Sequence, residues 1–261
     1  MALYPTVPAP HNNRGRPRAD DRRTLDAILY VLRTGIAWRD LPGDLGSPIT
    51  AWRGLKHWQA LDIWELLWRT ALNVLESKGA VDWSQAQLDG SFVPAKRGGA
   101  AVGLTRKGKG TKWMLVTDAR GTPIGYHPDS AGLAETRLAY KTLGTIGVRT
   151  ISGRVKNRPA CLVADRGYDN RPFRHFLRVR GIRACIPEKR RPEGWKPRRE
   201  RPTTYSKADY AQRWRIERTF AWLGYQRRLL IRWERHVDVY VAFFTVGVLM
   251  LVLRRLLHPV A

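Results

Sequence analysis

Gly79 separates two stretches of different texture, and the order of elements after it leaves few folds open. Before it, apolar residues recur at helical spacing, as in Leu25, Ile28, Leu29 and Leu32. After it, short apolar runs alternate with turn residues, which is typical of strands and loops. The spacing predicts this order: a strand, a hairpin, a helix, a strand, a helix, a strand and a long helix, over residues 85–93, 112–127, 133–143, 160–164, 171–180, 182–186 and 205–230.

A hairpin followed by strands that alternate with helices predicts an α/β fold with a mixed sheet. The order matches a ribonuclease-H-like layout. We therefore expect a ribonuclease-H-like mixed-sheet catalytic core over residues 81–261 and an all-helical domain over residues 20–80. Residues 1–19 form a basic arm in this interpretation.

The charge of the chain indicates its partner. Lys and Arg number 47 against 22 Asp and Glu, which gives a net charge of +25 and a pI near 11.1. Such an imbalance favours a polyanion, with nucleic acid first and an anionic membrane second. The longest apolar run, residues 237–253, is interrupted by Asp238 and shorter than the roughly 20 residues of a membrane span, so we expect a core helix and no membrane. Cys161 and Cys185 lack metal-binding neighbours, which is typical of core residues in a reducing cytoplasm.

The helical region has the outline of a helix-turn-helix. A tight turn over residues 42–46 precedes Ser47-Pro48, a helix start, and Ile49, Trp52, Leu55 and Trp58 would then face inward. The polar side chains of that helix would face DNA; they are Thr50, Arg53, Lys56 and His57. A plain helical bundle with a solvated face is the alternative. In the arm, Arg14, Arg16 and Arg18 suit the minor groove of A·T-rich DNA, although an unstructured basic tail has the same composition.

Asp89 and Asp165 are the carboxylates that the strand pattern singles out. Asp89 lies inside an apolar strand, where a charge needs a partner such as a metal ion, although Asp89-Gly90 is also a common turn pair. Asp165 ends a short apolar strand, at the sheet edge where α/β sites collect. We interpret Asp169 as the N-cap of the next helix and not as a ligand.

Glu217 is the third candidate. Tyr210, Arg213 and Glu217 are spaced by three and four residues, so they share one face of the long helix. Arg213 or a metal ion could balance Glu217, and a structural Arg213–Glu217 pair is the alternative. Three carboxylates would offer the hard oxygen ligands that suit Mg²⁺ or Mn²⁺. Two such ions can activate an attacking oxygen and stabilise a leaving oxygen at a phosphodiester.

The sequence resembles the DDE transposases of bacterial insertion sequences, in the insertion-sequence-five branch. The resemblance covers nearly the whole chain. Its markers are short motifs that begin at Arg14, Tyr30, Leu88, Gly110, Asp118, Ala164 and Arg215, for example Leu-Asp-Gly-Ser at 88–91 and Ala-Asp-Arg-Gly-Tyr-Asp at 164–169.

The resemblance implies a metal-dependent DNA transposase that acts in the bacterial cytoplasm, associated with the nucleoid. Such an enzyme binds inverted terminal repeats in double-stranded DNA, cleaves at the element ends and joins the 3′-hydroxyl to target DNA. It implies a homodimer in the synaptic complex. Asp89, Asp165 and Glu217 fall on the catalytic triad and would hold the metal. Tyr210, Arg213 and Glu217 fall on the family's Tyr-x2-Arg-x3-Glu-x6-Lys signature, so Tyr210 and Arg213 are expected to contact DNA.

Two departures from the family pattern stand out. Gly224 replaces the signature lysine, and Arg228, about three turns beyond Glu217, is a candidate substitute for its phosphate contact. Residues 1–13 lack the Trp-containing helix that often precedes the Arg-Gly-Arg-Pro motif, which favours a shortened or shifted reading frame.

Three further hypotheses stay open. A catalytically impaired relic would bind DNA without cutting it, and a basic RNA-binding or structural protein would carry its carboxylates by chance. The basic loop at residues 187–202 is either a clamp on the DNA backbone or a solvated insertion.

Overall fold

The computed structural model describes residues 19–189 and 204–258 of the chain. The arginines at 14, 16 and 18, and all but the first three residues of the predicted clamp at 187–202, lie outside the described residues.

The first part of the described chain is helical, as predicted. It contains α1 (Asp21–Thr34), two short 3-10 turns, η1 (Trp38–Asp40) and η2 (Gly43–Leu45), then α2 (Pro48–Ala60) and α3 (Ile63–Ser77). The carboxylate of Asp20 accepts the amide of Arg22 at the start of α1. Gly35 ends this helix with a positive φ of 75°, a conformation that favours glycine.

The predicted inward face of α2 is correct at Leu55 and Trp58 but wrong at Ile49, which is 63% exposed. Ala51 is buried instead. Trp52 is only partly buried, and its ring lies 6.4 Å from the ring of His236. The helix is therefore rotated from the predicted orientation, because its partners include His236, in the segment after η5, as well as the neighbouring helices.

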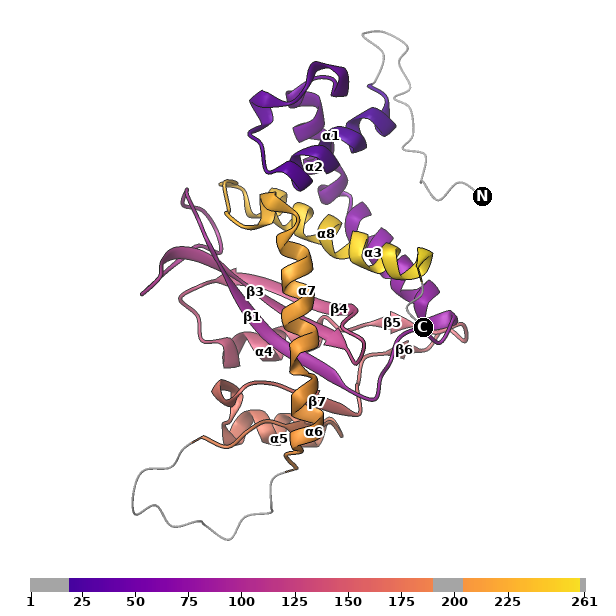
Figure 1. Cartoon of the computed structure of the whole chain (residues 1–261), viewed down its shortest axis with the longest axis vertical. Coiled ribbons are helices and arrows are strands. Elements are labelled where there is room, and N and C mark those ends of the chain that lie inside the picture. Colours follow the sequence, from indigo (N-terminus) through magenta and orange to yellow (C-terminus); the bar gives the residue numbers. More distant parts are fainter. Residues whose placement is uncertain (1–18, 190–203, 259–261) are drawn as a thin grey trace.

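A mixed sheet occupies the second part and has the predicted ribonuclease-H-like order (Figure 1). Its long strands are β1 (Ala86–Pro94), β3 (Gly108–Asp118) and β4 (Pro123–Ser130), which form an antiparallel meander. Two short strands, β7 (Cys161–Val163) and β8 (Arg183–Cys185), extend the sheet parallel to β1. A small strand, β2 (Gly103–Thr105), pairs with the start of β3, and β5 (Val148–Arg149) pairs with β6 (Val155–Lys156) outside this sheet.

Helices cover both faces of this sheet. In Figure 1, α7 (Trp214–Gly224) crosses in front of β1 and β3, and α4 (Glu135–Gly144) lies behind them. The shorter helix α5 (Arg171–Val179) packs beside β8. Asn170 caps α5 by accepting the amide of Phe173, so the prediction that Asp169 is the cap is wrong. Asp169 pairs with Arg174 at 2.8 Å instead.

The long helix predicted over residues 205–230 is interrupted. It consists of α6 (Lys207–Tyr210), the 3-10 turn η4 (Ala211–Arg213), α7, and, after a break, the 3-10 turn η5 (Arg227–Leu229). The break follows Gly224, the last residue of α7, and glycine is a poor helix former.

Helix α8 (Val237–Leu257) connects the helical part to the sheet. It lies beside α3 in Figure 1, and it also contacts α2, α7 and β4. Its Phe243 ring stacks on Trp38 at 5.6 Å, and its Phe244 ring stacks on Trp113 of β3 at 3.5 Å.

Among the described residues α8 alone is long and apolar enough to cross a membrane, with a mean hydropathy of 2.0, and 61% of that stretch is buried in the fold. The buried core thus runs across residue 80, and a domain boundary there stays a prediction.

Arg228 lies in this core, which contradicts its predicted role in binding DNA. It is 6% exposed, and its guanidinium pairs with Glu234 at 2.6 Å and donates to the carbonyl oxygen of Ile36 at 2.8 Å. Because α7 ends at Gly224, Arg228 does not continue the helical face of Glu217. It is a structural cation that ties η5 to the segment after α1.

We predict that Arg228→Met lowers the free energy of unfolding by about 3–5 kcal/mol, because Glu234 is left buried without its cation. Denaturant unfolding measures the loss. The double variant Arg228→Met/Glu234→Leu removes both charges and should regain most of that stability. A double variant as unstable as the single one would contradict this role of the pair.

Candidate active site

Asp89 lies in β1, and Asp165 follows the end of the neighbouring parallel strand β7 by two residues. Gln87 of β1 pairs with Val163, the last residue of β7, and two further residues along each segment lead to Asp89 and Asp165. The register therefore brings the two aspartates level at the carboxyl end of β7. Asp165 also raises the pKa of Asp89, as expected for two carboxylates at close range.

Asp89 is held inside the fold. Its side chain is 18% exposed, and its two oxygens accept from the amide of Gly90 at 2.8 Å and from Arg213 at 2.7 Å. Burial raises the pKa of the Asp89 carboxyl, and the charge of Arg213 opposes that rise without cancelling it. Asp89-Gly90 lies within a strand, so this pair is not an ordinary turn.

Asp165 begins a tight turn, η3 (Arg166–Tyr168). One oxygen of its carboxylate accepts the amide of Gly167 at 2.7 Å. The turn buries Tyr168 completely, and the Tyr168 hydroxyl donates to Glu135 of α4 at 3.2 Å. The turn that carries Asp165 is thereby anchored to the helix behind the sheet.

Arg213 joins Asp89 to Glu217. One guanidinium nitrogen lies 2.7 Å from Asp89 and another lies 2.8 Å from an oxygen of Glu217, in the first turn of α7. Burial acts to lower the pKa of Arg213, but the charges of Asp89 and Glu217 raise it overall. The predicted Arg213–Glu217 pair is present, and it extends across to the strand. Glu217 is more accessible than Asp89: 54% of its side chain is exposed, against 18% for Asp89.

The carboxylate oxygens of Asp89, Asp165 and Glu217 suit a hard divalent cation, but the guanidinium of Arg213 already occupies part of the site. Within residues 19–189 and 204–258, no three acidic, histidine or cysteine side chains stand close enough to hold one metal ion. Arg213 fills the space between Asp89 and Glu217 in this conformation. Carboxylate oxygens are the donors that Mg²⁺ and Mn²⁺ prefer, and an ion that bound all three would have to displace the Arg213 guanidinium.

A supporting cluster lies on the other face of β1, and the sequence did not single it out. Glu135, the first residue of α4, accepts from Tyr168 and lies 3.3 Å from the ammonium of Lys112. A Cβ on Gly90 would stand 2.9 Å from the sulfur of Met114 and 3.2 Å from Glu135. The signal in the sequence was Gly90 itself, because a glycine inside a strand often marks a close approach of another group.

The other predicted DNA contacts lie on separate elements. Arg53 is exposed on α2, and Lys56 is partly buried with its ammonium 5.5 Å from the ring of Trp52. Tyr210, the last residue of α6, packs against the cluster of Cys161, Val163 and Cys185.

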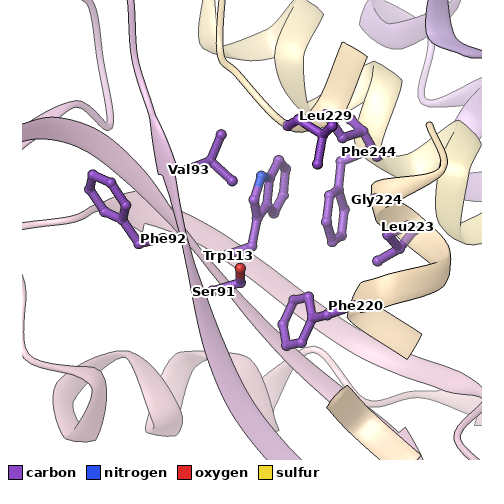
Figure 2. A pocket seen from close by; sticks show the side chains of 10 residues that line it. Ser91, Phe92, Val93, Trp113, Phe220, Leu223, Gly224, Leu229 and Phe244 are labelled. Atoms are coloured by element: carbon purple, nitrogen blue, oxygen red, sulfur yellow. The ribbon is translucent and has the colours of Figure 1, made fainter. Parts of the chain in front are cut away.

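A shallow apolar pocket borders the site, between β1 and the end of α7. In Figure 2, Ser91 and Val93 of β1 face Phe220 and Gly224 of α7 across Trp113. Gly224 is thus the position where a side chain would enter the pocket. A Cβ there would meet Leu230 at 3.5 Å, an ordinary contact, so the fold has room for one.

We predict that Gly90→Ala lowers the free energy of unfolding by about 1–3 kcal/mol, because the added methyl group overpacks the contact with Met114 and Glu135. Thermal unfolding measures the change. Gly98→Ala is the matched control, since a Cβ at Gly98 meets nothing within 4 Å. Equal melting temperatures for the two variants would show that Gly90 does not need its close approach.

Comparisons with known proteins cover most of the chain. The family model described as "Transposase DDE domain" matches residues 75–253. A second model, for proteins assigned as transposases of the IS4/5 family, matches residues 2–68.

Individual relatives match shorter segments. The chain is 39% identical over 105 residues to an uncharacterized 16.2 kDa protein of insertion element IS402 from Burkholderia cepacia, covering 40% of this chain and 71% of that protein. It is 35% identical over 139 residues to a protein assigned as the transposase of the same element, covering 53% of this chain and 60% of that protein. A solved structure, the Mos1 strand transfer complex, aligns over 95% of this chain and 79% of that one with a TM-score of 0.33 and 13% identity, too distant to add to the topology.

Proposed function

The chain belongs to the transposase DDE domain family, and on that premise we propose that Asp89, Asp165 and Glu217 form a site that cuts and joins DNA. The proposed reaction is cleavage at the inverted terminal repeats of an element, followed by attack of the 3′-hydroxyl on target DNA. The observation that carries the proposal is that Asp89 of β1 lies level with Asp165, just beyond the end of β7, while Glu217 is linked to Asp89 through Arg213.

The three carboxylates would hold Mg²⁺ or Mn²⁺. When bound, the ions supply a polarised phosphoryl group and an activated attacking oxygen. Arg213 would then be released from the carboxylates, and its planar guanidinium is well suited to a phosphate oxygen. The raised pKa of Asp89 is consistent with a buried site whose charge is completed by cations.

DNA would be held by residues beyond this site. Arg53 and Lys56 of α2 would contact it from the helical part. Tyr210 at the end of α6 and Arg213 at the end of η4 would contact it just before α7. The net charge of +25 supports a double-stranded DNA partner. A homodimer in the synaptic complex and action near the nucleoid complete the proposal.

We predict that the purified protein nicks labelled duplex DNA carrying the terminal repeats in the presence of Mg²⁺. Asp165→Asn should reduce the nicking rate by at least about 100-fold, because a lost metal ligand removes several kcal/mol of transition-state stabilisation. EDTA should have the same effect on the wild-type protein.

Asp26→Asn is the control for this experiment, since Asp26 is an exposed carboxylate on α1 with only a long contact of 3.7 Å to Arg22. It should nick at the wild-type rate. If wild-type and Asp165→Asn proteins nick equally, the enzyme proposal fails. Binding without nicking would identify the chain as a relic that only recognises DNA.

We also predict that Gly224→Lys strengthens binding to duplex DNA, because it restores a cation at the position of the signature lysine. The slope of log K against log salt should steepen by about 0.9, the value for one added phosphate contact. Gly224→Ala separates this gain from the stability gained by replacing a helical glycine, about 1 kcal/mol. Equal DNA affinity for the Lys and Ala variants would mean that residue 224 does not reach a phosphate.

A further inference from the structure

A row of alternating tryptophans and arginines runs along the outer side of α7. Trp214, Arg218 and Trp222 recur at every fourth residue, which places them in line on one side of the helix. The Arg218 guanidinium lies 4.6 Å from the ring centre of Trp214 and 4.6 Å from that of Trp222. Arg254 of α8 continues the row at 5.7 Å from Trp222. We call these four residues the arginine–tryptophan ladder.

The region around the ladder contains more arginines than carboxylates. Arg215, Arg218 and Arg255 donate to the carbonyl oxygens of Ala119 and Arg120, in the turn between β3 and β4. In the part of the chain that the structure describes, none of the five arginines of this region forms an ion pair within 4.0 Å; they are Arg120, Arg215, Arg218, Arg254 and Arg255.

Two carboxylates lie near this group, and neither neutralises it. Asp118 is 1% exposed and accepts backbone amides of Asp82, Arg120 and Thr122. Asp82 accepts the amide of Ser84 and is influenced by two of the arginines. Of these arginines Arg120 and Arg254 are exposed, and the other three are partly buried.

Burial and the like charges of neighbouring arginines both lower the pKa values of Arg218 and Arg255. Burial lowers the pKa of Arg255, and Asp118 opposes that change, while the neighbouring arginines lower the pKa further. Burial and then Arg215 lower the pKa of Arg218. Such crowding of like charges is costly in the free protein and is relieved by an anion.

The ladder adjoins the candidate active site. Trp214 follows Arg213 in the chain and Arg218 follows Glu217, so the two sets lie on adjacent sides of α7. From Trp214 to Trp222 the ladder is about 12 Å long, which spans three or four base pairs at about 3.4 Å each.

We propose that the arginine–tryptophan ladder binds the phosphate backbone of the DNA duplex that continues from the active site along α7. The proposal rests on the function proposed above and extends its DNA contacts to a surface outside the family signature. A guanidinium stacked on an indole ring can still donate from its edge to a phosphate oxygen. In Arg218 the Nε is buried and one terminal nitrogen donates to the carbonyl oxygen of Arg120, so the other terminal nitrogen and the exposed Arg254 would make the phosphate contacts. A second copy of this chain is a poor occupant, because each copy carries a net charge of +25.

The test is the salt dependence of binding to a duplex of arbitrary sequence, measured without divalent metal. Arg218→Gln/Arg254→Gln should reduce the slope of log K against log salt by about 2, since each lost phosphate contact removes about 0.9. Arg218→Lys/Arg254→Lys keeps both charges and should keep most of the slope. Thermal unfolding of each variant checks that the fold is intact.

Arg137→Gln/Arg154→Gln is the matched control, because both arginines are exposed on other elements. An unchanged slope for the folded Gln variant, or an equal fall for the control, would overturn the proposal. A loss of thermal stability without a change of slope would also overturn it and leave the arginines as anchors of the turn. Nicking by the wild-type protein with Mg²⁺ is measured in parallel. If the wild-type protein nicks DNA and the Gln variant keeps its slope, the ladder proposal alone is rejected. If the Gln variant loses slope and the wild-type protein does not nick, the cleavage function alone is rejected.

Discussion

The bridge from Arg213 to Asp89 and Glu217 organises the centre of this protein. Asp89 is buried in a strand and Glu217 begins a helix, so without a shared cation two like charges would face each other across the sheet surface. The same guanidinium links the first turn of α7 to β1. An interaction that stabilises the free protein therefore also keeps the proposed ligands close, in an arrangement that a divalent ion can take over.

The sheet and helices hold this bridge in place from both sides. Behind β1, the contacts of Glu135 with Tyr168 and Lys112 anchor the turn of Asp165, and Gly90 leaves room for them. In front, α8 packs between the sheet and the N-terminal helices through stacked aromatic rings. The active-site strand and the proposed DNA-binding helices thus share one core, which makes their relative position a property of the fold.

The sequence predicted the order of elements and the class of fold well, because apolar periodicity records which faces are buried. It also grouped Arg213 with Glu217, since helical spacing is local information. It failed where long-range packing decides: Ile49 is exposed, Asn170 replaces Asp169 as a cap, and Arg228 is buried beside Glu234. Glu135 escaped notice because no local pattern shows that the start of α4 meets β1 from behind. Metal binding by Asp89, Asp165 and Glu217 stays a proposal, because residue spacing alone does not specify an ion.

Affinity cleavage with Fe²⁺ tests the central claim most directly. Fe²⁺ replaces Mg²⁺ at oxygen-rich sites, and with ascorbate and peroxide it cuts the polypeptide next to the bound ion. A single metal site predicts cuts near residues 89, 165 and 217 in one preparation, all suppressed together by excess Mg²⁺ and by Asp165→Asn. Cuts confined to other segments, or cuts near these residues that respond to Mg²⁺ independently of one another, would contradict a single metal site built from Asp89, Asp165 and Glu217.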